Sequence, residues 1–272
     1  MDIEQTIFLG IIQGLTEVLP ISSSGHLVIF QNLIGLKNPE LLLDIALHVG
    51  TLLAVLIFFR ADIKMMVAEG IDFAGKIFRE RMPISTIQRS PYAALALWVL
   101  LGTIPTAIIG LIINSFSHIM FGSARFVGFM LMVTGSILGI SRLIPDHIKN
   151  KKQVELISAI TVGLVQGAAV IPGISRSGAT IVCGLFFGLD REIAGKFSFL
   201  LSVPAIVGAS LLKFDIVEIA DIGIIPLLTG ILVSFLVGLI ALKITMEMLK
   251  KGNLYYFAPY CFMAGILAIF IN

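Results

Sequence analysis

The stretch that decides the fold is Gln13-Gly14-Leu15-Thr16-Glu17-Val18-Leu19-Pro20-Ile21-Ser22-Ser23-Ser24-Gly25-His26. It places a carboxylate, three hydroxyls and an imidazole inside a run that otherwise has the composition of a membrane core. Polar and ionisable groups are costly in hydrocarbon, so a cluster of them in such a run is expected to be functional.

A second stretch repeats this pattern. It opens with Gln166-Gly167 and continues as Pro172-Gly173-Ile174-Ser175-Arg176-Ser177-Gly178-Ala179-Thr180. The glutamine, the first and last serines and the glycine after them recur at a constant offset of 153, and only the proline is displaced, by one residue. The recurrence indicates an internal duplication. We expect one integral membrane domain over 1–272, with a first repeat near 1–145 and a second near 154–272.

The composition is that of a membrane protein. Hydrophobic residues make up 57% of the 272 residues and charged residues 13%, with a mean hydropathy of +1.03. Soluble domains carry about 25% charged residues. Neither cysteine, Cys183 or Cys261, has a spacing that suggests a disulfide or a metal site, and nothing suggests nucleic-acid binding.

Six apolar segments are long enough to span a bilayer, or nearly so. They are Leu41–Phe59, Tyr92–Ile113, Phe126–Ile140, Phe197–Leu212, Ile222–Leu242 and Leu254–Ile271. Four shorter segments form two pairs, each interrupted by Pro, Gly and Ser: Ile7–Leu19 with Leu27–Leu36, and Leu156–Ile171 with Ala179–Leu189. A re-entrant helix–loop–helix fits each pair, because irregular backbone is tolerated at membrane depth only where protein or trapped water surrounds it. The predicted fold is therefore an all-α polytopic membrane protein with six transmembrane helices and two re-entrant pairs.

The distribution of basic residues supports this topology. With both pairs re-entrant, fifteen Lys and Arg fall on one side and three on the other; if each pair crossed once, the division would be eleven against seven. Cytoplasmic loops are enriched in Lys and Arg, so the re-entrant arrangement is favoured, with both termini outside. Three spans in each repeat make the second repeat inverted relative to the first. The polar segment 61–90 is then cytoplasmic, as a solvated loop or an amphipathic helix.

Glu17 and Arg176 are the charged candidates for the site. Glu17 shares a helix face with Gln13, four residues earlier, and could bind a divalent cation or accept a proton. Arg176 lies between two serines, a setting suited to bidentate phosphate binding. The structural alternative is a buried ion pair of Arg176 with Glu17 or Asp44, and a resting pair that opens for substrate would satisfy both interpretations.

The hydroxyl and imidazole groups leave several roles open. Ser22, Ser23 and Ser24 could hold an anion, one of them could be a nucleophile with His26 as its base, or one could simply cap the next helix. Ser175, Ser177 and Thr180 offer the same choice between substrate binding and capping. Asp44 and His48, one turn apart, could line the site or relay protons, or could be a supporting shell.

The chain resembles the undecaprenyl-diphosphate phosphatases, the bacitracin-resistance type of bacterial inner-membrane hydrolase. The resemblance rests on Gln13–Glu17, Leu19–His26 and Pro172–Thr180, with support from Asp44–Thr51 and Glu192–Pro204, and it covers essentially the whole chain. It implies hydrolysis of undecaprenyl diphosphate to undecaprenyl phosphate and inorganic phosphate on the outer face. That reaction recycles the lipid carrier for peptidoglycan and is associated with bacitracin resistance.

The resemblance also implies a divalent cation, Mg²⁺ or Ca²⁺, and assigns roles by position. Glu17 is implied as the acidic residue tied to the metal or to water activation, Ser23 and His26 as nucleophile or base, and Arg176 as the diphosphate clamp. Ser175 and Thr180 are implied as supporting hydroxyls. Many members have Glu where this chain has Gln13, which cannot take a proton, so a single carboxylate must suffice, with Asp44 as a candidate second metal ligand.

A second function class shares the predicted architecture. Inverted repeats with broken helices are the usual plan of transporters, so a polyprenyl-phosphate transporter or flippase is the alternative. The expected partners are the polyprenyl diphosphate substrate and the membrane lipids, with a second copy of the chain as a candidate partner in a homodimer.

Overall fold

The computed structural model describes residues 3–33, 41–80, 83–116, 120–213 and 223–270. Within these ranges the chain is helical, and the only strand-like feature is an isolated bridge between Lys151 and Leu189. The α-helices are α1 (Ile3–Val18), α2 (Ser23–Leu33), α3 (Leu41–Phe58), α4 (Arg60–Glu80), α5 (Pro91–Asn114), α7 (Ala124–Ile140), α8 (Leu156–Ala168), α9 (Arg176–Phe186), α10 (Arg191–Lys213), α12 (Ile224–Lys250) and α13 (Phe257–Ile269). Short 3-10 helices are η1 (Ile84–Arg89), η2 (Ser141–Leu143), η3 (Asp146–Ile148) and η4 (Leu254–Tyr256).

The helices confirm a polytopic membrane protein. Among the described residues, α5, α7, α10 and α12 are long and apolar enough to cross a bilayer, and α3 with α4 forms a fifth candidate span bent by 71°. Each of the six predicted spans corresponds to one helix, but α13 has only 13 residues because η4 precedes it. The predicted segment ends at Leu36, Ile222 and Ile271 lie outside the described residues.

The outer faces of the long helices are apolar stripes. Exposed aliphatic side chains recur every four residues and therefore share one helix face. On α5 they are Leu100, Ile104, Ile108 and Ile112, and on α12 they are Leu228, Leu232, Leu236, Ile240 and Ile244. Such stripes suit contact with lipid rather than with water.

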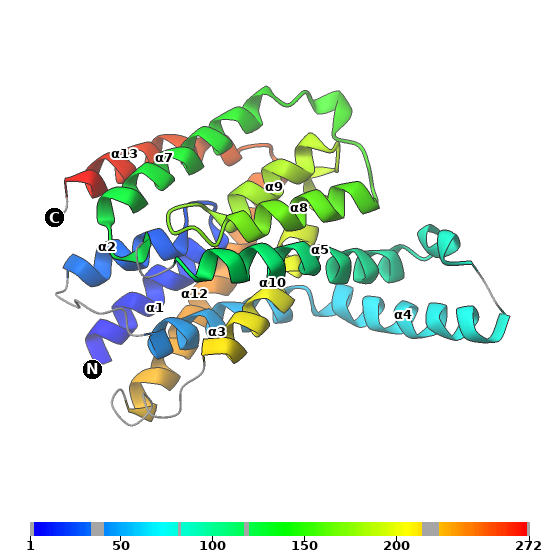
Figure 1. The fold of residues 1–272 in the computed structure, drawn as a ribbon, viewed down its shortest axis with the longest axis horizontal. Coiled ribbons are helices and arrows are strands. Elements are labelled where there is room, and N and C mark those ends of the chain that lie inside the picture. Colours follow the sequence, from blue (N-terminus) through cyan, green and yellow to red (C-terminus); the bar gives the residue numbers. More distant parts are fainter. Residues whose placement is uncertain (1–2, 34–40, 81–82, 117–119, 214–222, 271–272) are drawn as a thin grey trace.

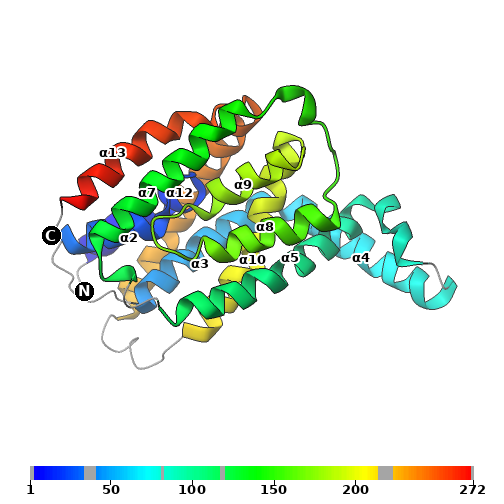
Figure 2. The ribbon, with the colours of Figure 1, turned by 45° about the horizontal axis from the view of Figure 1, so that its top comes forward.

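The two shorter helices that precede the serine-rich loops pack in equivalent ways. Figures 1 and 2 show the helices as one bundle, in which α1 packs along α12 and α8 packs along α5. The contacts are close because glycines face the partner helix: a Cβ added to Gly14 would lie 2.7 Å from Val237 Cβ, and one added to Gly167 would lie 2.7 Å from Ile109 Cβ. Small residues at such positions let membrane helices approach each other closely.

Helix α4 forms a projection with the start of α5. Figure 1 shows both extending beyond the end of the bundle. The polar segment after α3 is thus largely a 21-residue helix rather than an extended loop. Glu69 explains part of this order, because its Oε2 accepts hydrogen bonds from the backbone N–H of Tyr92 (2.9 Å) and Ala93 (3.3 Å) at the otherwise unpaired start of α5.

Candidate active site

The first serine-rich loop joins α1 to α2 and is held by a serine cap. Ser22 Oγ accepts a hydrogen bond from the backbone N–H of Gly25 (3.3 Å) and lies 3.4 Å from Ser24 Oγ. Side-chain oxygens at this position satisfy N–H groups that a helix start leaves unpaired. The predicted capping role of one serine in this loop is confirmed for Ser22, and α2 consequently begins at Ser23, earlier than the sequence pattern indicated.

The second loop repeats this geometry between α8 and α9. Ser175 Oγ accepts from the backbone N–H of Gly178 (3.1 Å) and lies 3.3 Å from Ser177 Oγ. Capping by Ser175 makes α9 begin at Arg176, so the guanidinium projects from the first residue of the helix. Thr180 is also satisfied locally, with its hydroxyl 2.7 Å from the carbonyl of Arg176 and 2.5 Å from Ser198 Oγ.

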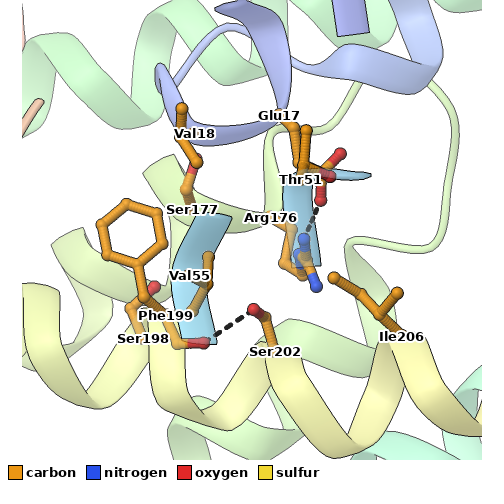
Figure 3. A pocket seen from close by; sticks show the side chains of 10 residues that line it. All are labelled: Glu17, Val18, Thr51, Val55, Arg176, Ser177, Ser198, Phe199, Ser202 and Ile206. Atoms are coloured by element: carbon orange, nitrogen blue, oxygen red, sulfur yellow. Dashed lines mark hydrogen bonds and ion pairs between the residues drawn. The ribbon is translucent and has the colours of Figure 1, made fainter. Parts of the chain in front are cut away.

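The two loops meet in an ion pair between Glu17 and Arg176. The Arg176 guanidinium donates to Glu17 Oε1 (Figure 3). The Glu17 side chain is 6% exposed and the Arg176 side chain is 21% exposed. The other carboxylate oxygen, Oε2, accepts from Gln13 Nε2 at 3.0 Å and from Ser23 Oγ at 2.5 Å. His48 Nε2 lies 3.5 Å from the same oxygen. A buried carboxylate therefore contacts a guanidinium, an amide, a hydroxyl and an imidazole.

This ion pair borders a small cavity of about 10 Å³, roughly the room of one water molecule. Figure 3 shows the cavity between the loops and α10, with Arg176 directed into it. Its lining residues are Glu17, Val18, Thr51, Val55, Arg176, Ser177, Ser198, Phe199, Ser202 and Ile206. The sequence argument missed Ser198 and Ser202, although their spacing of four residues in an apolar span places both hydroxyls on one face.

His26 takes a different direction from Ser23. Its Nδ1 lies 2.8 Å from the carbonyl oxygen of Ser22, and its Nε2 lies 2.7 Å from the hydroxyl of Tyr260 on α13. The imidazole and phenol rings are nearly parallel, with centroids 5.6 Å apart. Both imidazole nitrogens are thus engaged away from the Glu17–Arg176 pair, and sequence reasoning missed Tyr260 because nothing links it to His26 at a separation of 234 residues.

Of Asp44 and His48, only His48 contacts Glu17 with its side chain. The Asp44 carboxylate accepts from Gln31 Nε2 at 2.9 Å, whereas His48 reaches Glu17 directly. His48 Nδ1 lies 2.6 Å from the Asp44 backbone carbonyl, and this hydrogen bond orients the imidazole. The structure therefore brings Gln13, Glu17, Ser23, His48 and Arg176 together. Asp44 contacts this cluster through its backbone carbonyl, which lies next to His48 Nδ1.

The donor set around Glu17 suits a cation that also binds a diphosphate. In the part of the chain that the structure describes, no three His, Cys, Asp or Glu side chains gather as metal ligands. Mg²⁺, however, is commonly held by one or two carboxylates together with substrate phosphates and water. Gln13 Oε1 is buried without a hydrogen-bond partner next to Glu17. A carbonyl oxygen of this kind and the carboxylate are ligands that Mg²⁺ and Ca²⁺ accept.

The fold and the cluster define a class: a polytopic helical membrane protein with a polar, charged site where two serine-capped loops meet. Residues 6–267 match the family model described as bacitracin resistance protein BacA. The chain belongs to this family.

Curated relatives align over almost their whole length. The chain is 46% identical over 277 residues to a protein of Desulfosudis oleivorans, with 98% of each chain covered. It is 44% identical over 275 residues to one from Desulforapulum autotrophicum, covering 99% of this chain and 98% of the relative. A third, from Methanobrevibacter smithii, is 42% identical over 269 residues, covering 98% and 96%. All three relatives are named undecaprenyl-diphosphatase.

Proposed function

We propose that this chain hydrolyses undecaprenyl diphosphate to undecaprenyl phosphate and inorganic phosphate. The observation that carries the proposal is the contact of Arg176 with Glu17 across the two loops, beside a cavity. Phosphoryl transfer depends mainly on positioning and on neutralising charge, and a guanidinium binds phosphate in a bidentate manner. Arg176 is the diphosphate clamp, which leaves Glu17 when the headgroup arrives. The names of the relatives support the same reaction.

Ser23 is the nucleophile that this geometry favours. Its hydroxyl already donates to Glu17 at 2.5 Å, so the carboxylate can accept the proton as Ser23 Oγ attacks the terminal phosphorus. The bond from that phosphorus to the bridging oxygen breaks, and undecaprenyl phosphate departs. Water then attacks the phosphoserine, which releases inorganic phosphate and restores the Ser23 hydroxyl. His26, the other candidate base, has its accepting nitrogen on Tyr260.

A divalent cation, Mg²⁺ or Ca²⁺, completes the site. Glu17 and Gln13 Oε1 would hold it from the protein side, together with oxygens of the diphosphate. When bound there, such an ion would offset negative charge on the phosphates. Ser24, Ser177 and Thr180 provide hydroxyls around the headgroup, whereas Ser22 and Ser175 act through the caps that shape the loops.

The arrangement in the membrane follows from the duplication. We assign six transmembrane helices and two re-entrant pairs, α1–α2 and α8–α9, to an inverted repeat with both termini outside. The equivalent packing of Gly14 on α12 and of Gly167 on α5 supports the repeat, because these glycines are related by the offset of 153. The site faces outward in the cytoplasmic membrane, where the reaction recycles the peptidoglycan carrier and confers bacitracin resistance. The polyprenyl tail stays among membrane lipids, and a homodimer remains a candidate assembly.

The test is phosphate release by the purified protein. With undecaprenyl diphosphate and Mg²⁺ or Ca²⁺, the wild type is expected to release phosphate, and a chelator should stop the reaction. Arg176→Ala should abolish release, whereas Arg142→Ala, which removes an exposed arginine stacked on Tyr255, should not. Absence of phosphate release by the wild type, together with movement of the lipid between leaflets of vesicles, would instead establish a transporter.

A further inference from the structure

The loop between α1 and α2 contains a strained residue. Ser22 has φ of 73°, the only positive φ of a non-glycine residue within the described ranges. This region is sparsely populated by residues with a side chain, and holding one there is energetically unfavourable. The equivalent residue in the second loop, Ser175, has φ of −74° although it makes the same cap. Capping alone therefore does not require the strained conformation of Ser22.

The difference between the two loops coincides with His26. At the offset of 153, the position of His26 is occupied by Ala179, which has no polar side chain. The second loop is held instead by Thr134, whose hydroxyl donates to the carbonyl of Gly173 (2.8 Å) and accepts from the N–H of Ser175 (2.9 Å). Each loop thus has its own support, and in the first loop His26 Nδ1 reaches the carbonyl of the strained residue itself.

The hydrogen bonds fix the tautomer of His26. A backbone carbonyl only accepts, so Nδ1 must carry the proton that it donates to Ser22. In the neutral ring Nε2 is then an acceptor, and Tyr260 donates its hydroxyl proton to it. Since His26 is 3% exposed, loss of the Tyr260 hydroxyl would leave Nε2 buried without the hydrogen-bond donor that it has in the wild type. Tyr260 therefore stabilises both the plane and the tautomer of the imidazole.

We propose that Tyr260 is a positioning residue, which acts through His26 to hold Ser22 in its strained conformation and thereby aims Ser23 at Glu17. Ser23 directly follows Ser22, so rotation about the Ser22 backbone would move the Ser23 hydroxyl away from the carboxylate, 2.5 Å distant. The inference rests on the proposed function, in which Ser23 attacks the phosphate. It assigns to His26 a supporting role rather than proton transfer to the substrate.

The experiment compares Tyr260→Phe with Tyr256→Phe, which removes the hydroxyl of an exposed tyrosine whose ring contacts Tyr255. Tyr260→Phe should lower kcat for phosphate release by roughly 10- to 100-fold, the range found when a partner that orients a metal-ligating imidazole is lost, with a smaller change in KM. Tyr256→Phe should leave kcat unchanged.

A Ser22→Gly background, which relieves the backbone strain, tests whether Tyr260 acts through Ser22. Glycine adopts positive φ at little cost and is a tolerable cap. In a Ser22→Gly background, Tyr260→Phe should therefore lower kcat several-fold less than it does in the wild type. An undiminished effect would overturn the proposal, because Tyr260 and His26 would then act on the substrate directly. Equal rates for Tyr260→Phe and Tyr256→Phe would overturn it as well.

A readout independent of activity separates this inference from the proposed function. In protein labelled with ¹⁵N-histidine, the His26 resonances, assigned by their loss in His26→Gln, should show a protonated Nδ1 and an accepting Nε2. Tyr260→Phe should shift the Nε2 resonance, and Tyr256→Phe should not. If the wild type released no phosphate, the proposed function would fail while this spectrum still tested the contact. An active wild type with an Nε2-protonated His26 would refute the positioning role alone.

Discussion

Breaking the Glu17–Arg176 pair should destabilise the protein by an amount set by what remains around Glu17. Arg176→Met removes the charge while keeping an apolar side chain of similar length, and it leaves a carboxylate that is 6% exposed. Losing one partner of a buried pair typically costs about 3 to 5 kcal/mol. Glu17 keeps its hydrogen bonds from Gln13 and Ser23 and has His48 at 3.5 Å, so part of its compensation remains. The lower end, about 3 kcal/mol, is therefore expected.

For a chain of this size, about 3 kcal/mol corresponds to a fall in the apparent unfolding midpoint of roughly 6 to 12 °C. Thermal unfolding in one detergent, followed by tryptophan fluorescence or by helix content, measures this shift. Adding Glu17→Gln to Arg176→Met should restore most of the midpoint, because the uncompensated charge is gone. Arg142→Met, which removes a cation–π contact at the surface, should cost less than about 1 kcal/mol. If Arg176→Met were as stable as Arg142→Met, the reasoning about a buried pair would be refuted.

Three further predictions concern the supports of the site. Thr134→Val keeps the shape of the side chain but leaves the carbonyl of Gly173 and the N–H of Ser175 unpaired. The free energy of unfolding should therefore fall by about 2 to 4 kcal/mol, and the rate of phosphate release should fall as well. Ser136→Ala, at an exposed position on the same helix, is the control in both assays. Gly167→Val should destabilise the protein by about 1 to 3 kcal/mol because the side chain would collide with Ile109 and the carbonyl of Thr106, whereas Gly208→Ala, with open space around it, should have little effect on the midpoint. Outside the spans, the hydrogen bond and charge of Lys149 and the charge of Arg191 lower the pKa of Asp146 below its ordinary value of 3.8. The stability that the ionised Asp146 contributes is therefore present above pH 3.8 and is lost as the pH falls through the lowered pKa. The difference in unfolding midpoint between wild type and Asp146→Asn should shrink on acidification below pH 3.8, and a difference that grew instead would contradict the assignment.

The sequence predicted those parts of the site that depend on local pattern. The offset of 153 related the loops, and the serine that caps each following helix lies where Ser-x-Ser-Gly places it. The pairing of Glu17 with Arg176 was anticipated because two opposite charges in apolar surroundings each need a partner. Composition was sufficient for the membrane assignment, although α13 is shorter than its apolar run and α4 is more regular than its polar composition indicated.

Contacts that depend on tertiary packing were beyond the sequence argument. Tyr260 and Thr134 lie in apolar helices where a hydroxyl has no distinctive neighbours, and only the packing of α13 and α7 against the loops gives each one a partner. The direction of His26 is a further case: its spacing of three residues from Ser23 predicts a shared helix face, but the packing of α13 gives the imidazole Tyr260 as its partner while Ser23 contacts Glu17.

A duplicated frame with unlike charges explains why the site can exist inside a membrane. The two loops share the same serine caps, but at the shared offset Ser23 corresponds to Arg176 and Glu17 corresponds to Val170. Had both copies kept the carboxylate or both the guanidinium, like charges would lie together in a poorly solvated cavity, where repulsion adds to the cost of burial. Divergence to one acid and one base lets each neutralise the other at rest. Under the proposed function, an arriving diphosphate would take the place of Glu17 at Arg176, and a cation held by Glu17 would keep the charges balanced. In that proposal, the pair that is buried together at rest is also the pair that would bind the substrate and its cation.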